Sequence, residues 1–320
     1  MDGGSDPAET GWLETGGLAF NGGMKRALTM ADADAVLALF HEYDREFFGE
    51  GLADLEDLIS GWQAPSFSFD NTLGHVDDAG ELVAFGSLDV RGQLEVFCRA
   101  AWRRPLAAEL ADHFEQRARD NGLAAVDRYI AEGDTAGRAE LVARGYEQHH
   151  TSWILRLDEA TPIAGRVLPP GYAVRPFRDG DGPAVHAVIQ DAFAAWDPDE
   201  RSYEDWEAMT LNRPGGDPTI FRVATYEDEI IGAAVVFDSV DETWVAQLAT
   251  HVDHRGRGVA QQLLASAYEA GRDRGLAFAG LSTDTRTGAL DLYLRLGMRV
   301  LFTLENWSLS LDSSAAHPTG

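Results

Sequence analysis

The stretch LATHVDHRGRGVA, residues 248–260, decides the fold prediction, because in it an apolar strand turns sharply into a helix. The strand breaks at residues 251–254, and Arg-Gly-Arg-Gly then leads directly into the helical pattern QQLLASAYEAGRDRG. Only a residue without a Cβ atom lets the backbone turn so tightly and lie against a ligand. The helix offers free N–H groups and the positive end of its dipole, which suit a diphosphate, and the two arginines add charge for phosphate oxygens. The sequence therefore predicts a phosphate-binding turn.

The composition predicts an acidic, soluble protein of two domains. Its 320 residues are about twice a common domain length, and 45% of them are hydrophobic, which is enough for two buried cores. The 53 acidic and 26 basic residues give a formal charge of −27. Such a charge repels nucleic acid and anionic membranes and favours a cationic small molecule, although we attribute most of it to solubility.

The cysteine count and the lengths of the apolar runs indicate the cellular compartment. Cys98 is the single cysteine and lies in the apolar run LEVFC, so we expect a buried, inert thiol and neither a disulfide framework nor a thiolate metal site. No run of about 18 apolar residues and no signal-peptide pattern is present. We therefore expect a cytoplasmic protein that binds no metal and no membrane.

The chain repeats itself. Arg26-Ala-Leu and the following acidic turn match Arg175-Pro-Phe at an offset of 149 residues, and WILRLD at 153–158 matches WSLSLD at 307–312. We predict a flexible leader at 1–23, a first unit at 24–158, a linker at 159–171, a second unit at 172–312 and a tail at 313–320. Three prolines and two glycines interrupt regular structure in the linker sequence TPIAGRVLPPG.

Both units are predicted to have the same order of elements. For the second unit, hydrophobic periodicity predicts strands at 172–176, 221–226, 230–238, 244–250, 278–282 and 302–311, with helices at 183–195, 196–212, 259–274 and 287–296. For the first unit, it predicts helices at 31–47, 105–121 and 136–144, with strands at 67–77, 81–90, 94–99, 125–130 and 149–157. Asp181 is expected to cap the helix that Pro183 begins.

Two motifs of the second unit lie about 35 residues apart. They are Arg255-Gly-Arg-Gly258-Val-Ala260, which follows a strand, and ALDLYLRLGM at 289–298. The first matches the acetyl-CoA motif, Arg/Gln-x-x-Gly-x-Gly/Ala, and the second matches the second signature of the GCN5-related N-acetyltransferases (GNAT), which this unit closely resembles. The doubled layout is similar to tandem members of that family. The resemblance implies an α/β (α+β) protein of two tandem GNAT-like domains, each with a mixed, largely antiparallel central sheet flanked by helices.

The resemblance also implies a donor site for acetyl-CoA as the acyl-donor co-substrate. The pantetheine would lie along Leu248, Ala249 and Thr250, and the diphosphate on the turn formed by Arg255, Gly256, Arg257, Gly258, Val259 and Ala260. Tyr293 occupies the family's position for the general acid. Arg286 stands where many members carry Asn, and it could reach a phosphate instead.

The implied reaction is direct attack of an amine on the thioester carbon. The amine, with a reference pKa near ~10, must first lose a proton, and the thiol that leaves has a pKa of about 8.5, so a weak acid is enough to help it. A backbone N–H of the strand at 248–250 would stabilise the oxyanion. The proton acceptor stays open among six carboxylates: Asp197, Asp199, Glu200, Asp238, Asp241 and Glu242.

The first unit has lost the phosphate-binding turn. It carries WRRPLA at 102–107, in which Pro105 removes an amide donor and Leu106 places a side chain where a diphosphate would lie. Leu141 replaces the tyrosine. We predict that this unit is a degenerate GNAT-like domain that does not bind acetyl-CoA productively and that helps to form the acceptor cleft of the second unit.

The leading functional hypothesis is an N-acetyltransferase that acts on a small-molecule amine, with the loop at 196–213 setting acceptor choice. A non-catalytic acyl-CoA-binding or regulatory protein is the alternative, and O-acylation or a longer acyl donor stays open. We expect a monomer, as an internal pseudo-dimer, or a homodimer, and no nucleic-acid partner.

Overall fold

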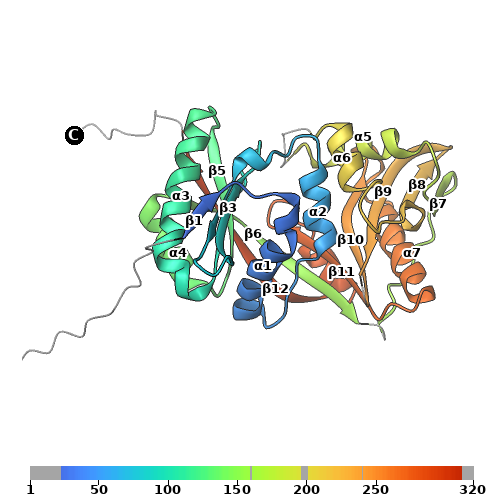
Figure 1. Ribbon diagram of the computed structural model, residues 1–320. Coiled ribbons are helices and arrows are strands. Elements are labelled where there is room, and N and C mark those ends of the chain that lie inside the picture. The colour runs from blue at the N-terminus through green and yellow to red at the C-terminus, as the bar shows by residue number, and fades with distance from the viewer. Residues whose placement is uncertain (1–22, 159–160, 196–200, 240, 312–320) are drawn as a thin grey trace, which may run out of the picture.

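The structure is a computed structural model that describes residues 23–158, 161–195, 201–239 and 241–311 (Figure 1). The first half of the chain contains β1 (Met24–Arg26), α1 (Ala33–Phe48), α2 (Leu55–Gln63), β2 (Thr72–Val76), β3 (Leu82–Leu88), β4 (Leu94–Cys98), α3 (Arg103–Asp120), β5 (Ala125–Ala131), α4 (Thr135–Arg144) and β6 (Glu147–Asp158). The predicted order of elements is present, but α2 was not predicted from the sequence. The predicted tail and all but the last residue of the leader lie outside the described residues.

The second half repeats that order. It contains β7 (Tyr172–Pro176), α5 (Gly182–Phe193), α6 (Tyr203–Met209), β8 (Arg222–Tyr226), β9 (Glu229–Asp238), β10 (Glu242–Thr250), α7 (Val259–Asp273), β11 (Phe278–Asp284), α8 (Leu290–Arg295) and β12 (Arg299–Ser310). The second helical stretch is shorter than predicted, because α6 occupies only part of 196–212.

The halves exchange their last strands. One sheet has the order β1-β2-β3-β4, and the other has the order β5-β12-β6-β11-β10-β9-β8-β7. In the larger sheet β6, from the first half, pairs with β11 of the second, while β12, from the second half, pairs with β5 of the first. The sequence predicts each half's last strand but not this exchange, since strand patterns carry no information on which edge a strand will join.

The second half has a core on both faces of its sheet. Six consecutive residues of β9, Ile231–Val236, are buried, which requires cover on both sides of the strand. Helices α5 and α7 both contact β9 and β10, and α7 buries residues at helical spacing, including Val259, Leu263 and Ala267. Leu155 and Leu157 of the exchanged strand β6 belong to this same core.

The first half has its own buried clusters on the four-stranded sheet, which α3 covers in Figure 1. Cys98 is buried in one of them, and burial raises the pKa of its thiol to about 12, as expected for an inert cysteine. Among the described helices, none is both long and apolar enough to cross a membrane.

The repeat seen in the sequence corresponds to a repeated ion pair. Arg26 forms a bidentate ion pair with Asp32, with N···O distances of 2.8 and 2.6 Å. Arg175 forms the same contact with Asp181, at 2.6 and 3.0 Å. Asp181 makes no side-chain capping bond to α5, contrary to expectation, because its carboxylate is held by Arg175 and by the Arg178 amide. These acidic turns fix the strand-to-helix corner in both halves.

Candidate active site

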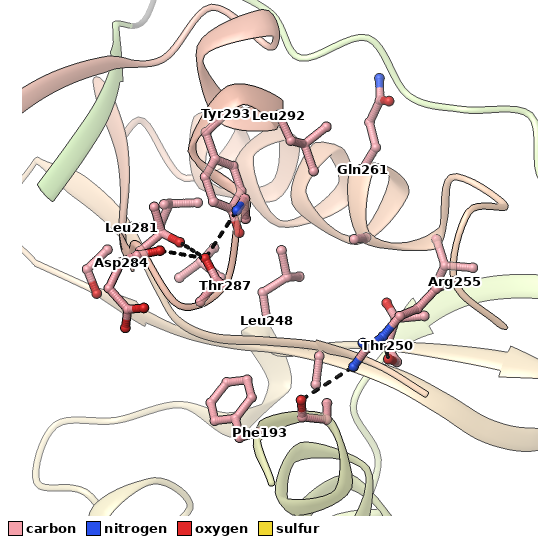
Figure 2. A pocket seen from close by; sticks show the side chains of 18 of the residues that line it. Phe193, Leu248, Thr250, Arg255, Gln261, Leu281, Asp284, Thr287, Leu292 and Tyr293 are labelled. Atoms are coloured by element: carbon pink, nitrogen blue, oxygen red, sulfur yellow. Dashed lines mark hydrogen bonds between the residues drawn. The ribbon is translucent and has the colours of Figure 1, made fainter. Parts of the chain in front are cut away.

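The candidate site forms where two parallel strands of the larger sheet separate. β10 and β11 pair from Glu242 with Phe278 to Val245 with Leu281, and then diverge. A β-bulge between Val245 and Gln247 redirects β10 at this point. The divergence opens a cavity of about 1070 Å³ (Figure 2).

Every residue that the sequence placed in the donor site lines this cavity. They come from the end of β10, the turn after it, the start of α7, the loop after β11, and α8: Leu248, Ala249, Thr250, Arg255, Gly256, Arg257, Gly258, Val259, Ala260, Arg286 and Tyr293. In Figure 2 Leu248 lies between Arg255 at one end of the view and Asp284 at the other. The two motifs of the sequence therefore meet in space.

The glycines of the turn adopt the conformation that the sequence predicted. Gly256 has φ +75° and Gly258 has φ +84°, both in the left-handed region that L side chains rarely adopt. Gly258 is the N-cap residue of α7 and offers no side-chain capping bond. Among the residues that the structure describes, no side chain caps the first amides of α7, which are presented to the cavity.

The arginines of the turn make contacts that the sequence did not predict. Arg255 donates to the carbonyl oxygens of Thr250 at 3.1 Å and Ala192 at 3.3 Å, so it ties the end of β10 to the end of α5. Arg257 donates to the Asp253 carbonyl and lies over the Tyr172 ring, 6.0 Å from its centroid. Both side chains order the turn in addition to adding positive charge to it.

Arg286 forms an ion pair with Asp284, with Nη2 to Oδ2 at 2.7 Å. Burial alone would raise the pKa of the Asp284 carboxyl, but the hydrogen bonds and charge of Arg286 outweigh burial and lower it. Asp284 therefore carries a negative charge at neutral pH, and it is the one carboxylate among the described residues that line the cavity.

Tyr293 lies on α8, lines the cavity and is only 7% exposed. Burial raises the pKa of its hydroxyl to about 12, so the group keeps its proton through neutral and mildly alkaline pH. The side chain also packs in the core of the second half, so the tyrosine serves both packing and the cavity.

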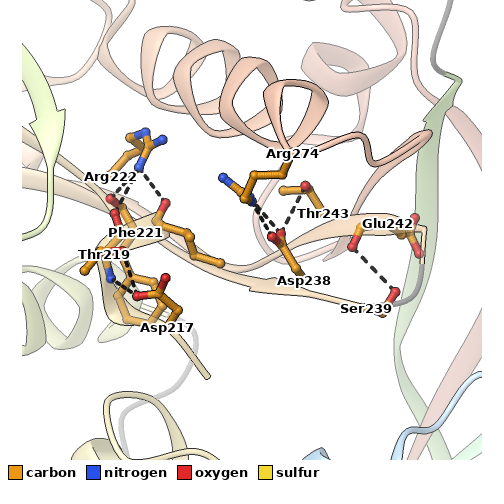
Figure 3. A network of polar contacts seen from close by, with 10 residues as sticks. Asp217, Thr219, Phe221, Arg222, Asp238, Ser239, Glu242, Thr243 and Arg274 are labelled. Atoms are coloured by element: carbon orange, nitrogen blue, oxygen red, sulfur yellow. Dashed lines mark hydrogen bonds and ion pairs between the residues drawn. The ribbon is translucent and has the colours of Figure 1, made fainter. Parts of the chain in front are cut away.

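Two of the open proton-acceptor candidates are engaged elsewhere (Figure 3). Asp238 accepts hydrogen bonds from Arg274 at 2.6 Å and from Thr243 at 3.1 Å. Glu242 pairs with Arg156 at 3.0 Å. Within the described part of the chain, these two and Asp241 do not line the cavity, because they lie at the opposite end of β10 from the turn. The candidates Asp197, Asp199 and Glu200 lie outside the described residues.

Sequence reasoning missed cavity residues from outside the second unit. Tyr129, Ser152 and Ile154 line the cavity from β5 and β6, and Arg166 and Val167 reach it from the linker. One signal was available for the linker: Arg166 is the only charged residue in TPIAGRVLPPG. The strand residues carried none, since their position depends on the strand exchange.

Comparisons with known proteins agree with this geometry. Residues 183–298 match the acetyltransferase (GNAT) family. A mycothiol acetyltransferase of Saccharopolyspora erythraea is 26% identical in an alignment of 250 positions, and the alignment covers 69% of this chain and 79% of that protein.

Solved structures give the same fold. A GCN5-related N-acetyltransferase from Sphaerobacter thermophilus has a TM-score of 0.73 at 24% identity, covering 90% of this chain and 95% of that one. A tandem GNAT protein from the clavulanic acid biosynthesis pathway has a TM-score of 0.70 at 15% identity, covering 92% of this chain and all of that one.

The diverging strands, the glycine turn and these matches define an acyltransferase of the GNAT fold. The chain is an N-acetyltransferase that resembles the GNAT family through residues 183–298 and the mycothiol acetyltransferases over most of its length, and it has the fold of a tandem GNAT protein. The predicted resemblance, fold class and enzyme class are thereby confirmed.

Proposed function

We propose that the second half of this protein transfers an acetyl group from acetyl-CoA to the amine of a small molecule, and that the first half binds no donor. The observation that carries the proposal is the turn at Gly256 and Gly258, which presents to a large cavity helix amides that no side chain among the described residues caps. The corresponding segment of the first half, WRRPLA, has no glycine and carries Pro105 and Leu106.

The cavity suits coenzyme A at both ends. The turn and the first amides of α7 fit a diphosphate, and a Cβ atom on Gly258 would narrow this cradle. Leu248, Leu281 and Leu292 give the cavity apolar walls suited to the pantetheine arm. Thr250 Oγ1 is buried without a hydrogen-bond partner among the described residues, and it lines the same cavity. A buried polar atom of this kind is satisfied when a ligand with amide groups lies beside it.

The residues present support direct transfer. Beyond Val245, β10 pairs with β9 and no longer with β11, so alternate amides of β10 are directed at the cavity. One of them would stabilise the oxygen that gains negative charge when the amine nitrogen attacks the thioester carbon. The protonated Tyr293 hydroxyl would donate its proton to the sulfur as the carbon–sulfur bond breaks. The protons that the amine nitrogen loses before and after its attack would pass to water, and water would return one to the tyrosine oxygen.

The acceptor would bind on the wall that both halves build. Ser152, Ile154 and Tyr129 come from strands of the first half, and Asp284 supplies a negative charge beside them. A carboxylate kept ionised by Arg286 orients an ammonium group better than it removes a proton, since its pKa is lowered. A cationic small amine fits this chemistry, and the overall charge of −27 favours its approach.

Calorimetry and a thiol-release assay test the proposal together. The full chain should bind one coenzyme A, and acetyl-CoA should release thiol with at least one member of a panel of amino sugars, polyamines and amino-acid derivatives. Two equivalent donor sites would contradict the assignment to one half. Tight binding of coenzyme A with no thiol release from any acceptor would favour the non-catalytic alternative.

A further inference from the structure

The linker between the two halves lies on the first turns of α7 and is held there by specific contacts. Ile163 is buried in the core of the second half. Gln261 donates to the Ala164 carbonyl at 2.8 Å, and the Arg166 amide donates to Gln262 Oε1 at 2.7 Å. These contacts fix the position of a segment whose sequence predicts only a spacer. We call residues 163–167 the linker strap.

The linker strap places Arg166 against the glycine turn. An ideal Cβ atom built on Gly258 would lie 3.0 Å from Arg166 Cγ and 3.1 Å from its Cβ. The Arg166 Nε donates to Gln261 Oε1 at 2.9 Å, so a neutral amide, not a carboxylate, orients the guanidinium. The cation therefore stands beside the N-terminus of α7.

This placement concentrates positive charge without a counter-charge. A helix N-terminus carries partial positive charge, and a cation beside it is unfavourable unless an anion lies between the two. Arg166, Arg255 and Arg257 surround the turn, and in the described parts of the chain none of them forms an ion pair with a carboxylate. Most other arginines of this acidic protein that the structure describes are paired with carboxylates, for example Arg175 and Arg213.

Val167 adds an apolar surface next to that charge. The residue is 99% exposed, and it lines the cavity beside Arg166. A single exposed valine is common, but this one belongs to a cavity wall that a flat, apolar ligand group would cover.

We propose that the linker strap is part of the donor site and recognises the nucleoside diphosphate end of the donor. Arg166 contacts the diphosphate from the side opposite the α7 amides, and Val167 packs against the adenine. This inference rests on the proposed function only in taking acyl-CoA as the donor. The segment that joins the halves thus contributes directly to binding, so the donor site is incomplete in the second unit alone.

Calorimetry of the full chain with coenzyme A, dephospho-coenzyme A and pantetheine tests this inference. Arg166→Gln should weaken both nucleotide-bearing ligands roughly tenfold, the effect of one charge-assisted contact. The affinity for pantetheine, measured by its displacement of coenzyme A, should not change. Arg166→Lys should restore part of the loss, because a point charge replaces the planar fork. Arg119→Gln removes an exposed arginine of α3 with the same change in net charge and should have no effect.

Val167→Ser should weaken coenzyme A roughly threefold through lost apolar contact, whereas Val142→Ser, at an exposed valine of α4, should not. Unchanged affinity of Arg166→Gln for coenzyme A would overturn the inference. A loss seen with coenzyme A but absent with dephospho-coenzyme A would overturn the diphosphate assignment. If the unmodified protein fails to bind coenzyme A, the proposed function itself fails, and that result is distinct from the other two.

Discussion

The two halves place different turns at the same point of one repeated frame. In the second half, β10 is followed by two left-handed glycines, and α7 begins after Gly258. In the first half, α3 begins at Arg103 directly after a right-handed residue, and Leu106 is buried in the core. Among the described residues, no left-handed glycine directly precedes α3, and Pro105 lacks an amide donor in its first turn. The two glycines thus distinguish the proposed donor-binding turn of the second half from the corner of the first.

The spaces between the paired strands next to the two turns also differ, since one is open and the other is filled. β10 and β11 enclose a large cavity, whereas β4 and β5 meet only at a bridge between Gln93 and Asp127. The space beside β4 and β5 is filled by a hydrophobic cluster that includes Leu106, Leu141 and Trp307. Trp307 comes from the exchanged strand β12, so the second half fills the space between β4 and β5 that corresponds to the cavity between β10 and β11.

The largest expected effect follows from cutting the chain between the halves. A fragment of residues 161–311 lacks β6, and with it the buried Leu155 and Leu157. Burying two leucines contributes about 3–6 kcal/mol, which approaches the whole stability of many domains. We expect no cooperative unfolding of this fragment in urea, and recovery when residues 23–158 are co-expressed with it. A fragment that unfolds like the intact chain would show that the exchange is dispensable.

The next largest effect concerns the glycine turn. Gly258→Glu forces a side chain into left-handed backbone and against Arg166, and brings a carboxylate to the anion cradle. We expect coenzyme A to bind roughly 100-fold more weakly by calorimetry, about 2.7 kcal/mol. Pro105→Glu, at the matching position of the first half, should leave the affinity unchanged. If both variants lost the same coenzyme A affinity, the assignment of donor binding to the second half alone would be wrong.

The tyrosine of the second motif should affect the rate and not the binding. Tyr293→Phe should lower kcat roughly 100-fold, the usual contribution of a general acid, with the Kd of coenzyme A unchanged. Tyr146→Phe alters a buried tyrosine in the first half and should cost stability without changing kcat. A Tyr293→Phe enzyme with full activity would assign Tyr293 to packing alone.

The pH dependence of the rate gives a second test of the role of Tyr293. The pKa of Tyr293 is raised to about 12 by burial, so its proton is lost only above the range in which a free tyrosine ionises. A pH–rate profile between pH 7 and 10 should therefore show no fall caused by this group. A fall near pH 10 that Tyr293→Phe abolishes would contradict the burial of the hydroxyl.

The smallest expected effect concerns the arginine–aspartate ion pair that both halves contain. Asp32→Asn and Asp181→Asn should each destabilise the protein by about 1 kcal/mol in urea at pH 7, additively, since the two ion pairs are separate. Bonds from Arg26 lower the pKa of Asp32 to about 2, and bonds from Arg175 lower that of Asp181. Because the pKa is lower in the folded state, this contribution is complete at neutral pH and declines as the pH falls below about 4. If the difference in unfolding free energy between each variant and the unmodified protein grew as the pH fell, the ion-pair explanation would be contradicted.

The sequence predicted much of the fold, and all eleven residues that it assigned to the donor site and its acid line one cavity, while their roles stay predictions. These predictions were possible because left-handed turns, helix starts and apolar periodicity each depend on a few adjacent residues, as in RGRGVA. The sequence did not predict the contacts of Arg255, which depend on the approach of α5, nor the engagement of Asp238 and Glu242 by arginines distant in the chain. Ion-pair partners of this kind follow from packing, not from spacing.

By itself the sequence determined that the chain is a doubled unit and that one copy alone carries the glycine turn. Only the tertiary structure decided that β6 and β12 change places and that Arg166 of the linker faces Gly258. The physical reason is the range of the interactions. Backbone conformation depends on a few adjacent residues, whereas strand neighbours and cavity walls depend on which buried surfaces fit together across more than a hundred residues of chain.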